Sequence, residues 1–342
     1  METNINNAIR SIVSSYESQQ VVVVTTEKVH ACRPEVAALD FPMLVLAGGE
    51  GNKSLETIQK IWDFLFAHSV TRRGLLICIG GGVLTDLGGF AASTYKRGID
   101  YVNIPTTLLA MVDASTGGKT GINYGGLKNS IGTFYTPKQT IICPSLLTTL
   151  PARHLLNGFA EMLKTGLLDA DLWNALLPFD VESMEIDCLT PLIEKCVRVK
   201  ERIVSADPQE TGLRKALNLG HTFGHALEEI QFLQSKPADP VLLHGYAVLY
   251  GLIAELYLSV VLEGMAREPL QQLTQYMLHY YGKLQCSCKD RDKLISLMQQ
   301  DKKNEHVGEI NCTLLQAVGQ PIINRAITRE QALEAFDYLF SL

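Results

Sequence analysis

The sequence predicts an α/β protein with a Rossmann-like parallel sheet in residues 1–150, followed by an all-α domain in residues 151–342. In the first part, short runs rich in Val, Ile and Leu alternate with helical patterns, as expected for parallel strands buried on both faces. After residue 151 the strand signal nearly vanishes and helical periodicity continues. A length of 342 residues, 46% of them hydrophobic and 19% charged, suits two globular domains.

Five apolar runs are expected to form the sheet. They are QVVVVTT (20–26), PMLVLA (42–47), GLLICIG (74–80), YVNIP (101–105) and QTIICP (139–144). Helical patterns at 54–69 and 84–98 separate the second, third and fourth runs. Strands alternating with helices in this way predict βαβ units and a parallel sheet.

The second part is expected to be helical. The segments with helical periodicity are 155–170, 187–206, 213–231, 244–263, 268–282, 290–303 and 328–340, and one β-like segment, 309–319, precedes the last of them. The most apolar stretch, 246–262, carries Glu255 and is shorter than the roughly 20 residues of a membrane span. We therefore expect it to be a buried helix.

Charge and cysteine content narrow the possible partners. Thirty basic and thirty-six acidic residues give a net charge of -6, and the basic residues form no long block. We therefore expect neither nucleic acid nor a membrane surface as a partner, and expect small molecules instead. The first residues lack the pattern of a signal peptide, and the eight scattered cysteines lack zinc-knuckle spacing. We expect reduced thiols and a cytoplasmic location.

A glycine-rich stretch, LLICIGGGVLTDLGGFAAS (75–93), joins an expected strand to an expected helix. Glycines let a backbone approach a pyrophosphate, and a helix N-terminus offers N–H groups to the anion. The fingerprint G-x-G-x-x-G fails because, counted from Gly80, its last position is Thr85. A plain tight turn stays an alternative. A second loop, LAGGEGNKS (46–54), offers Glu50 as an acceptor for a ribose hydroxyl.

The stretch VDASTGGKTGINYGGLKNSIG (112–132) contains GGKT, which is similar to the end of a Walker A loop. That motif requires a glycine where Asp113 stands, so phosphate binding is plausible and ATP chemistry is not. Lys119 and Lys128 lie here in what we expect to be a flexible loop. Solvated surface lysines are the alternative explanation.

Two histidines lie four residues apart in NLGHTFGHALEEI (218–230). On one helix His221 and His225 share a face, so both could bind a single metal ion. Hydrogen-bonded core histidines explain the spacing equally well. Arg214 and Asn218 extend the same face with polar side chains, which predicts a wet functional cavity rather than a core contact.

Further metal-ligand types occur nearby in the sequence. Glu161 is followed one turn later by Lys164, and His244 opens another expected helix. One carboxylate and imidazoles form the three-ligand set of a catalytic zinc site with open positions. The spacings do not decide which histidines bind.

Together these motifs resemble 3-dehydroquinate synthases, of the sugar-phosphate cyclase superfamily, over nearly the whole length from about residue 40. The blocks that carry the resemblance are GGGVLTDLGGFAASTYKRG, IPTTLLAMVDASTGGKTGIN, KNSIGTFYTPK, TLPARHLLNGFAEMLKTGLL, NLGHTFGHALE and LLHGYAV. The resemblance implies a Rossmann-like NAD domain followed by an α-helical metal and substrate domain, in agreement with the expectation from periodicity.

The resemblance also implies roles for single residues. Glu161, His221 and His244 match the ligands of Zn²⁺ or Co²⁺, His225 a proton-transferring histidine, and Glu210 a proton acceptor. Substrate-binding positions match Lys119, Asn129, Asn157, Lys164, Lys200, Arg214 and Asn218, with Arg97 reaching a neighbouring subunit of a homodimer and either Lys302 or Lys303 contacting phosphate. NAD-binding positions match Glu50, Lys53, Gly81, Gly82, Val83, Asp86, Thr106, Thr107, Asp113, Lys119, Lys128, Leu146 and Thr149.

Two positions depart from the family pattern. The usual HGEAV is HGYAV here, so Tyr246 replaces a Glu that we expect to support the metal ligands from outside. This puts metal affinity in question rather than reaction type. Thr26 stands where the first strand commonly ends in an Asp that contacts the cofactor.

The implied activity is the conversion of 3-deoxy-D-arabino-heptulosonate 7-phosphate to 3-dehydroquinate and phosphate, a lyase reaction of the shikimate pathway to chorismate and the aromatic amino acids. It would proceed by transient oxidation by NAD, phosphate elimination, re-reduction and intramolecular aldol closure. Alternatives are a related metal-dependent polyol dehydrogenase, another sugar-phosphate cyclase, and a nucleotide-binding scaffold whose metal site has decayed. A substrate with two anionic ends is favoured by four anion-binding candidates: Lys164, Lys200, Arg214 and Asn218. The decayed scaffold is supported only by Tyr246.

Overall fold

The computed structural model describes residues 5–182, 185–234, 242–286, 288–300 and 308–342. The chain forms two compact units. The first comprises Met1–Leu155 with Glu185–Val197, and the second comprises Leu156–Met184 with Arg198–Leu342.

A parallel five-stranded sheet forms the centre of the first unit. Its strands are β1 (Val21–Thr26), β2 (Met43–Leu46), β3 (Leu75–Gly80), β4 (Asp100–Pro105) and β7 (Gln139–Thr140), in the order β2-β1-β3-β4-β7. The sequence prediction of this sheet is confirmed, although the last strand is shorter than its apolar run. The strand order reverses between β1 and β3, and open sheets of this kind bind ligands at the carboxyl ends of the strands beside the reversal.

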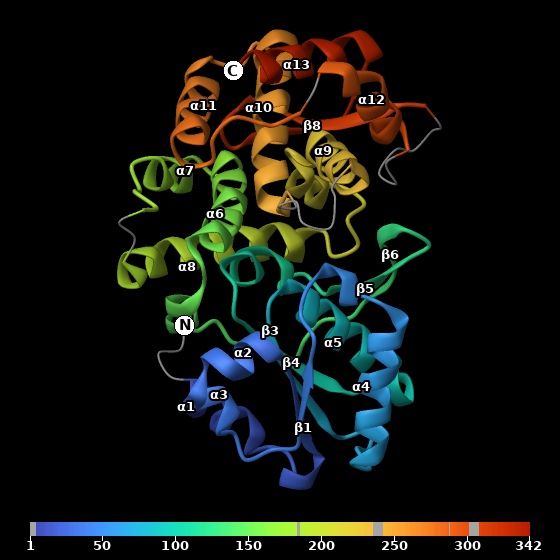
Figure 1. Ribbon diagram of the computed structural model, residues 1–342. Coiled ribbons are helices and arrows are strands. Elements are labelled where there is room, and N and C mark those ends of the chain that lie inside the picture. The colour runs from blue at the N-terminus through green and yellow to red at the C-terminus, as the bar shows by residue number, and fades with distance from the viewer. Residues whose placement is uncertain (1–4, 183–184, 235–241, 287, 301–307) are drawn as a thin grey trace. The chain divides into compact units, whose positions relative to one another are not determined.

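Helices cover the sheet because its strands are apolar on both faces. Helices α4 (Leu55–Ala67) and α5 (Gly82–Thr94) lie along one side, and the short helices α1 (Ile5–Val13), α2 (Glu27–Cys32) and α3 (Pro34–Ala37) lie elsewhere around it (Figure 1). Side chains of α4, α5, β1 and β3 share one buried core. This core fixes the start of α5 at the end of β3.

The glycine-rich segment 112–132 is ordered differently from the flexible loop that we expected. It contains a five-residue π-type turn (Ala110–Ala114) and then an antiparallel hairpin of β5 (Lys119–Tyr124) and β6 (Leu127–Phe134). Gly125 and Gly126 form the tip of the hairpin with φ of 61° and 79°. A two-residue hairpin turn requires such left-handed backbone, which glycine adopts without strain.

The second unit is mainly helical, as predicted. Its helices are α6 (Ala152–Leu167), α7 (Ala170–Leu176), α8 (Ile186–Ala206, shared with the first unit), α9 (His221–Gln234), α10 (His244–Glu263), α11 (Glu268–Tyr280), α12 (Arg291–Gln299) and α13 (Arg329–Ser341). It also contains a hairpin of β8 (Ile310–Ala317) and β9 (Gln320–Ile327), of which the sequence indicated only the first strand.

Helix α10 lies among α9, α11, α13 and β8 (Figure 1). By length and composition it could cross a membrane, but 72% of its most apolar window is buried inside the protein. The expectation of a buried core helix is confirmed.

The prediction of one continuous helix over 213–231 is wrong. A 3₁₀ helix, η6 (Leu213–Asn218), ends before α9 begins at His221. Gly220 has φ of 79°, and a Cβ there would lie 2.7 Å from the Leu252 side chain and 2.8 Å from the Val248 carbonyl oxygen. Only glycine combines this backbone with so close an approach. The polar residues that we expected on one helix face are therefore divided between two elements: Arg214 and Asn218 lie in η6, and His221 and His225 lie in α9. His221 is the first residue of its helix.

Candidate active site

Three side chains of the second unit form a cluster that can hold a metal ion. Glu161 comes from the middle of α6, His221 from the start of α9 and His244 from the start of α10. One ligand atom from each lies within 4.8 Å of the other two. Glu161 Oε1 lies 3.8 Å from His221 Nε2 and 3.3 Å from His244 Nε2, and Glu161 is fully buried. A carboxylate and two imidazoles converging in this way fit a catalytic zinc or cobalt site.

Partners at the far ring nitrogens fix the orientation of both imidazoles. His221 Nδ1 lies 3.1 Å from the Leu219 carbonyl oxygen, to which it can only donate. His244 Nδ1 lies 3.3 Å from Glu228 Oε2. With Nδ1 of each ring turned to these acceptors, Nε2 is the nitrogen on the Glu161 side, and it is the atom that would offer its lone pair to a metal.

Glu228 was missed in the sequence, although a signal was available. It lies seven residues after His221 and three after His225 in α9, and these spacings place all three on one helix face. A carboxylate behind a metal-binding histidine raises the basicity of the ligand and fixes its tautomer.

The cluster is electrostatically suited to a cation. Burial opposes charging of His244, but hydrogen bonds to Glu161 and Glu228 and their negative charges outweigh burial and raise its pKa to about 10. Lys164, itself buried, places its Nζ 2.5 Å from Glu161 Oε2. Without an ion, protons and Lys164 thus supply the positive charge that the carboxylates attract.

His225 lies one turn beyond His221 in α9 and belongs to the same cluster. Its ring centroid is 5.2 Å from that of His221 and 6.1 Å from that of His244. His225 is partly exposed whereas His221 is buried. An accessible imidazole beside the metal ligands can contact substrate and transfer protons.

Three further predicted residues lie in η6 (Arg214 and Asn218) and in the loop before it (Glu210). Asn218 Nδ2 donates to Glu210 Oε1 at 3.0 Å, and the buried Arg214 donates through Nη1 to the Pro208 carbonyl at 2.7 Å. Asp207 accepts hydrogen bonds from the N–H groups of Thr211, Gly212 and Arg214 at 2.7–3.1 Å. Partial burial opposes ionisation of Asp207, but these backbone bonds outweigh it and lower its pKa.

Asn157 has a structural contact that the sequence did not indicate. Its Oδ1 accepts the N–H of Gly245 at 2.7 Å, next to His244, so Asn157 fixes the start of α10 on α6. Its amide nitrogen is the part that could contact a substrate. Lys200, in α8, is buried as well.

In the first unit, the residues expected to bind NAD follow the carboxyl ends of several parallel strands. Glu50 and Lys53 follow β2; Gly81, Gly82, Val83 and Asp86 follow β3; Thr106, Thr107 and Asp113 follow β4; Leu146 and Thr149 follow β7. Thr26, at the end of β1, caps α2 through Val29. These strand ends include the reversal between β1 and β3, where a nucleotide is expected.

The glycines after β3 leave the start of α5 open. A Cβ on Gly81 would lie 3.1 Å from the Thr107 side chain, and one on Gly82 would lie 3.0 Å from Ala114. Gly81 is the N-cap, and none of the described side chains caps this helix. Its first N–H groups are thus available to a phosphate, which the predicted NAD site requires.

Polar contacts tie the loop after β2 to α5 and the hairpin. Lys53 Nζ lies 2.5 Å from Asp86 Oδ2 and also donates to Asn129 Oδ1. Asn123 donates to Glu50 Oε1 at 2.8 Å. Burial raises the pKa of Asp86, and the charge of Lys53 partly offsets this. Lys119 and Lys128 are exposed on the hairpin.

Three predicted site residues have left-handed backbone, which non-glycine residues rarely adopt. They are Arg97 (φ 65°), Asn129 (φ 50°) and Glu210 (φ 58°). Such strain concentrates at functional sites. Arg97 is exposed. Lys302 and Lys303, one of which we expected to contact phosphate, lie outside the described residues.

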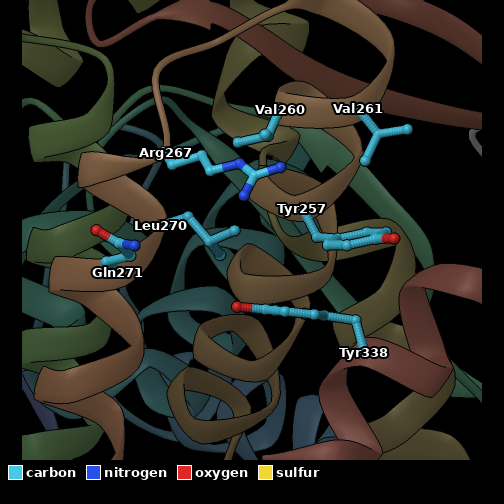
Figure 2. A pocket seen from close by; sticks show the side chains of 7 residues that line it. All are labelled: Tyr257, Val260, Val261, Arg267, Leu270, Gln271 and Tyr338. Atoms are coloured by element: carbon cyan, nitrogen blue, oxygen red, sulfur yellow. The ribbon is translucent and has the colours of Figure 1, made fainter.

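A pocket of about 260 Å³ lies elsewhere in the second unit, among α10, α11 and α13 (Figure 2). The described residues that line it are Tyr257, Val260, Val261, Arg267, Leu270, Gln271 and Tyr338, none of which is a predicted site residue. It is therefore distinct from the predicted site.

The fold and the side-chain cluster define a protein with a parallel α/β unit and a helical unit that carries a metal-capable triad. Models of the N-terminal and C-terminal regions of 3-dehydroquinate synthase match residues 43–157 and 158–304. The 3-dehydroquinate synthase of Parabacteroides distasonis is 43% identical over 341 residues, which cover 98% of this chain and 95% of that one. The chain belongs to the 3-dehydroquinate synthase family.

Solved structures of related cyclases have the same fold. A 2-epi-5-epi-valiolone synthase from Streptomyces hygroscopicus, with NAD+ and Zn²⁺ bound, matches with a TM-score of 0.83 and 30% identity, covering 94% of this chain and 90% of that one. A 2-deoxy-scyllo-inosose synthase complexed with carbaglucose-6-phosphate, NAD+ and Co²⁺ matches with a TM-score of 0.78 and 23% identity, covering 96% and 93%. The predicted fold class is thus confirmed.

Proposed function

We propose that this chain is an NAD- and metal-dependent carbon–oxygen lyase. It converts 3-deoxy-D-arabino-heptulosonate 7-phosphate to 3-dehydroquinate and phosphate. The observation that carries the proposal is the cluster of Glu161, His221 and His244 in a chain of this family.

The donor sets fit both cofactors. Glu161, His221 and His244 would hold Zn²⁺ or Co²⁺, and the strand ends with the open start of α5 would hold NAD. The two cyclase structures with NAD+ and Zn²⁺ or Co²⁺ support this assignment. When bound, the metal would polarise the substrate hydroxyl oxygen and NAD would accept and return a hydride; the transient ketone would acidify the hydrogen on the neighbouring carbon, so that phosphate can leave from the carbon beyond it.

The buried cations of the second unit would select the substrate. Lys164, Lys200 and Arg214 are at most 6% exposed, so their charges act in a poorly solvated environment. Such cations bind phosphate and carboxylate by charge-assisted hydrogen bonds. Asn218 and Asn157 are the polar groups of this unit that we assign to the rest of the substrate.

Two groups of this chain would move protons. His225 is partly exposed beside the triad, and Glu210 is bound to Asn218. We assign proton transfer at the reacting centre to His225 and proton acceptance to Glu210. Glu210's carboxylate is oriented by the Asn218 amide, so replacing Asn218 should affect both binding and proton transfer.

The test is phosphate release and 3-dehydroquinate formation from the heptulosonate phosphate by the purified chain with NAD, with and without a chelator. Activity lost with chelator and restored by Zn²⁺ or Co²⁺ supports the proposal. Because NAD is regenerated in each turnover, no net NADH should accumulate; net NADH with a polyol would indicate the dehydrogenase instead.

Another sugar-phosphate cyclase is the second candidate, favoured by the likeness to the valiolone synthase. A seven-carbon sugar phosphate without a carboxylate separates the two in the same assay. Turnover of this compound, with the heptulosonate phosphate inert, would contradict our assignment.

We also propose a cytoplasmic homodimer in which Arg97 reaches the neighbouring subunit. The exposure and left-handed backbone of Arg97 support a role at the surface. Sedimentation of the purified chain tests the dimer, and replacing Arg97 by Ala should weaken substrate binding without changing metal content.

A further inference from the structure

Glu255 is a buried carboxylate that the proposed chemistry does not use. It lies in the middle of α10 and is fully buried. A carboxylate is costly to bury unless hydrogen bonds replace its lost water. Its contacts therefore indicate why it is there.

The carboxylate of Glu255 binds the backbone on both sides of His221. Oε2 accepts the N–H of Gly220 at 2.5 Å, and Oε1 accepts the N–H of Thr222 at 3.3 Å. These donors lie at the start of the 14-residue helix α9, where N–H groups lack partners within the helix. The positive end of the helix dipole also favours a negative charge there.

The rest of this α10 face leaves the chain before His221 little room to move. Val248, Gly251, Leu252 and Glu255 recur at the spacing of one helix face. A Cβ on Gly251 would lie 2.0 Å from the Gly220 carbonyl oxygen. Because the two backbones touch, a shift of Glu255 relative to α9 would be transmitted to Gly220.

The other side of this turn of α10 is also held. Ser259 Oγ donates to the Glu255 carbonyl at 2.7 Å and accepts the N–H of Leu315 in β8 at 2.9 Å. A continuous series of hydrogen bonds therefore runs from β8 through α10 to the start of α9. Glu255 is the group in this series that reaches the backbone of His221's neighbours.

We propose that Glu255 is a positioning residue for the metal ligand His221. By holding the N–H groups of Gly220 and Thr222, it fixes the backbone from which the imidazole extends, while the Leu219 carbonyl fixes the ring. The inference rests on the proposed metal site. It assigns to α10 two contributions: a ligand at its start and, three turns later, the group that orients the ligand on α9.

The charged carboxylate matters because both of its oxygens accept. A Gln at position 255 would keep one acceptor and turn an NH₂ group toward one of the two N–H donors. The start of α9 would lose a hydrogen bond and gain an unfavourable contact, while side-chain volume stays the same. Glu255→Gln therefore changes the positioning of His221 with little change in packing.

The test is Co²⁺ binding to the full-length chain, followed by competition with a chelator and by the visible absorption of the bound ion. We expect Glu255→Gln to bind Co²⁺ about 10- to 100-fold more weakly, the range for partners outside the ligand set. We also expect altered Co²⁺ absorption bands, because the ligand geometry changes. Glu263→Gln is the matched control in the same helix, since Glu263 pairs with Arg325 at 2.6 Å.

The outcomes separate this inference from the proposed metal site. If the parent chain binds no Co²⁺, or if His221→Ala binds it as well as the parent does, the metal site itself is wrong. If the parent binds and folded Glu255→Gln has the parent's affinity and spectrum, the positioning inference is wrong. Lower thermal stability with an unchanged spectrum would make Glu255 merely structural.

A folding failure of the first variant is covered by a second. Glu255→Asp keeps the charge but shortens its reach, and the same affinity and absorption measurements apply to it. Weakened binding with altered bands supports the inference. If neither variant folds, Glu255 is required for the fold itself and the positioning assignment is overturned.

Discussion

The division of labour between the two histidines of α9 gives a sharp test of the site. His221→Ala removes one of three donors that lie within 4.8 Å of one another. His225→Ala leaves these three donors in place, and it also leaves the Nδ1 partners of both ligand rings, the Leu219 carbonyl and Glu228. The two residues lie one turn apart on the same helix, so any general disturbance of α9 should affect both variants.

The structure sets the expected magnitudes. Partners outside the ligand set typically contribute 10- to 100-fold to metal affinity, so losing a ligand should cost more than about 100-fold, or about 3 kcal/mol. His225→Ala should change metal affinity by less than about 10-fold, the lower limit of that range. Its turnover should fall by about 10²- to 10⁴-fold, as for the loss of a general acid or base.

The assay is metal content and Zn²⁺ affinity of both purified variants, followed by turnover at saturating metal. Excess Zn²⁺ should partly restore His221→Ala and leave His225→Ala inactive. Equal loss of metal in both variants would show that His225 is a ligand. Full metal affinity in His221→Ala would refute the proposed triad.

Three further substitutions test other parts of the second unit. Glu228→Gln should weaken Zn²⁺ binding about 10-fold with little loss of thermal stability; an unchanged affinity in chelator competition would exclude a role behind His244. Gly251→Ala should lower the free energy of unfolding by about 2 kcal/mol or more in urea, because its Cβ would overlap the Gly220 carbonyl; parent-like unfolding would contradict the tight helix contact. Asp207→Asn should be less stable than the parent at neutral pH. Because the folded state lowers the pKa of Asp207, that difference should disappear as pH falls below the ordinary value near 3.8 and through the lowered one; a pH-independent difference in urea unfolding would rule out the charge.

Periodicity predicted the elements whose burial is regular. The first four strands of the sheet and the bounds of α10, at 244–263, agree with their apolar patterns, whereas β7 covers only the first two residues of its run. Periodicity failed where single backbone positions decide the structure. The helix expected over 213–231 breaks at Gly220, whose approach to Leu252 and Val248 joins residues far apart in the chain. No local pattern contains that contact.

The ligand set shows a similar division. Spacing identified His221 and His225 as equivalent candidates, and it could not distinguish between them. The distinction comes from α6 and α10, because Glu161 Oε1 and His244 Nε2 lie beside His221. In the sequence, Glu255 indicated only that α10 does not span a membrane. Its contacts could not be predicted, because its partners are backbone N–H groups, which do not depend on residue type.

The replacement at position 246 becomes less important once the contacts of His244 are known. Tyr246 lies two residues after His244, which places it on a different side of α10, and its ring packs on Tyr281 at 4.8 Å. The carboxylate at His244 Nδ1 comes instead from Glu228. A metal-binding histidine needs one such partner, and α9 already provides it. The unusual Tyr therefore gives no reason to expect a decayed metal site, and Glu228→Gln should affect metal affinity more than any change at Tyr246.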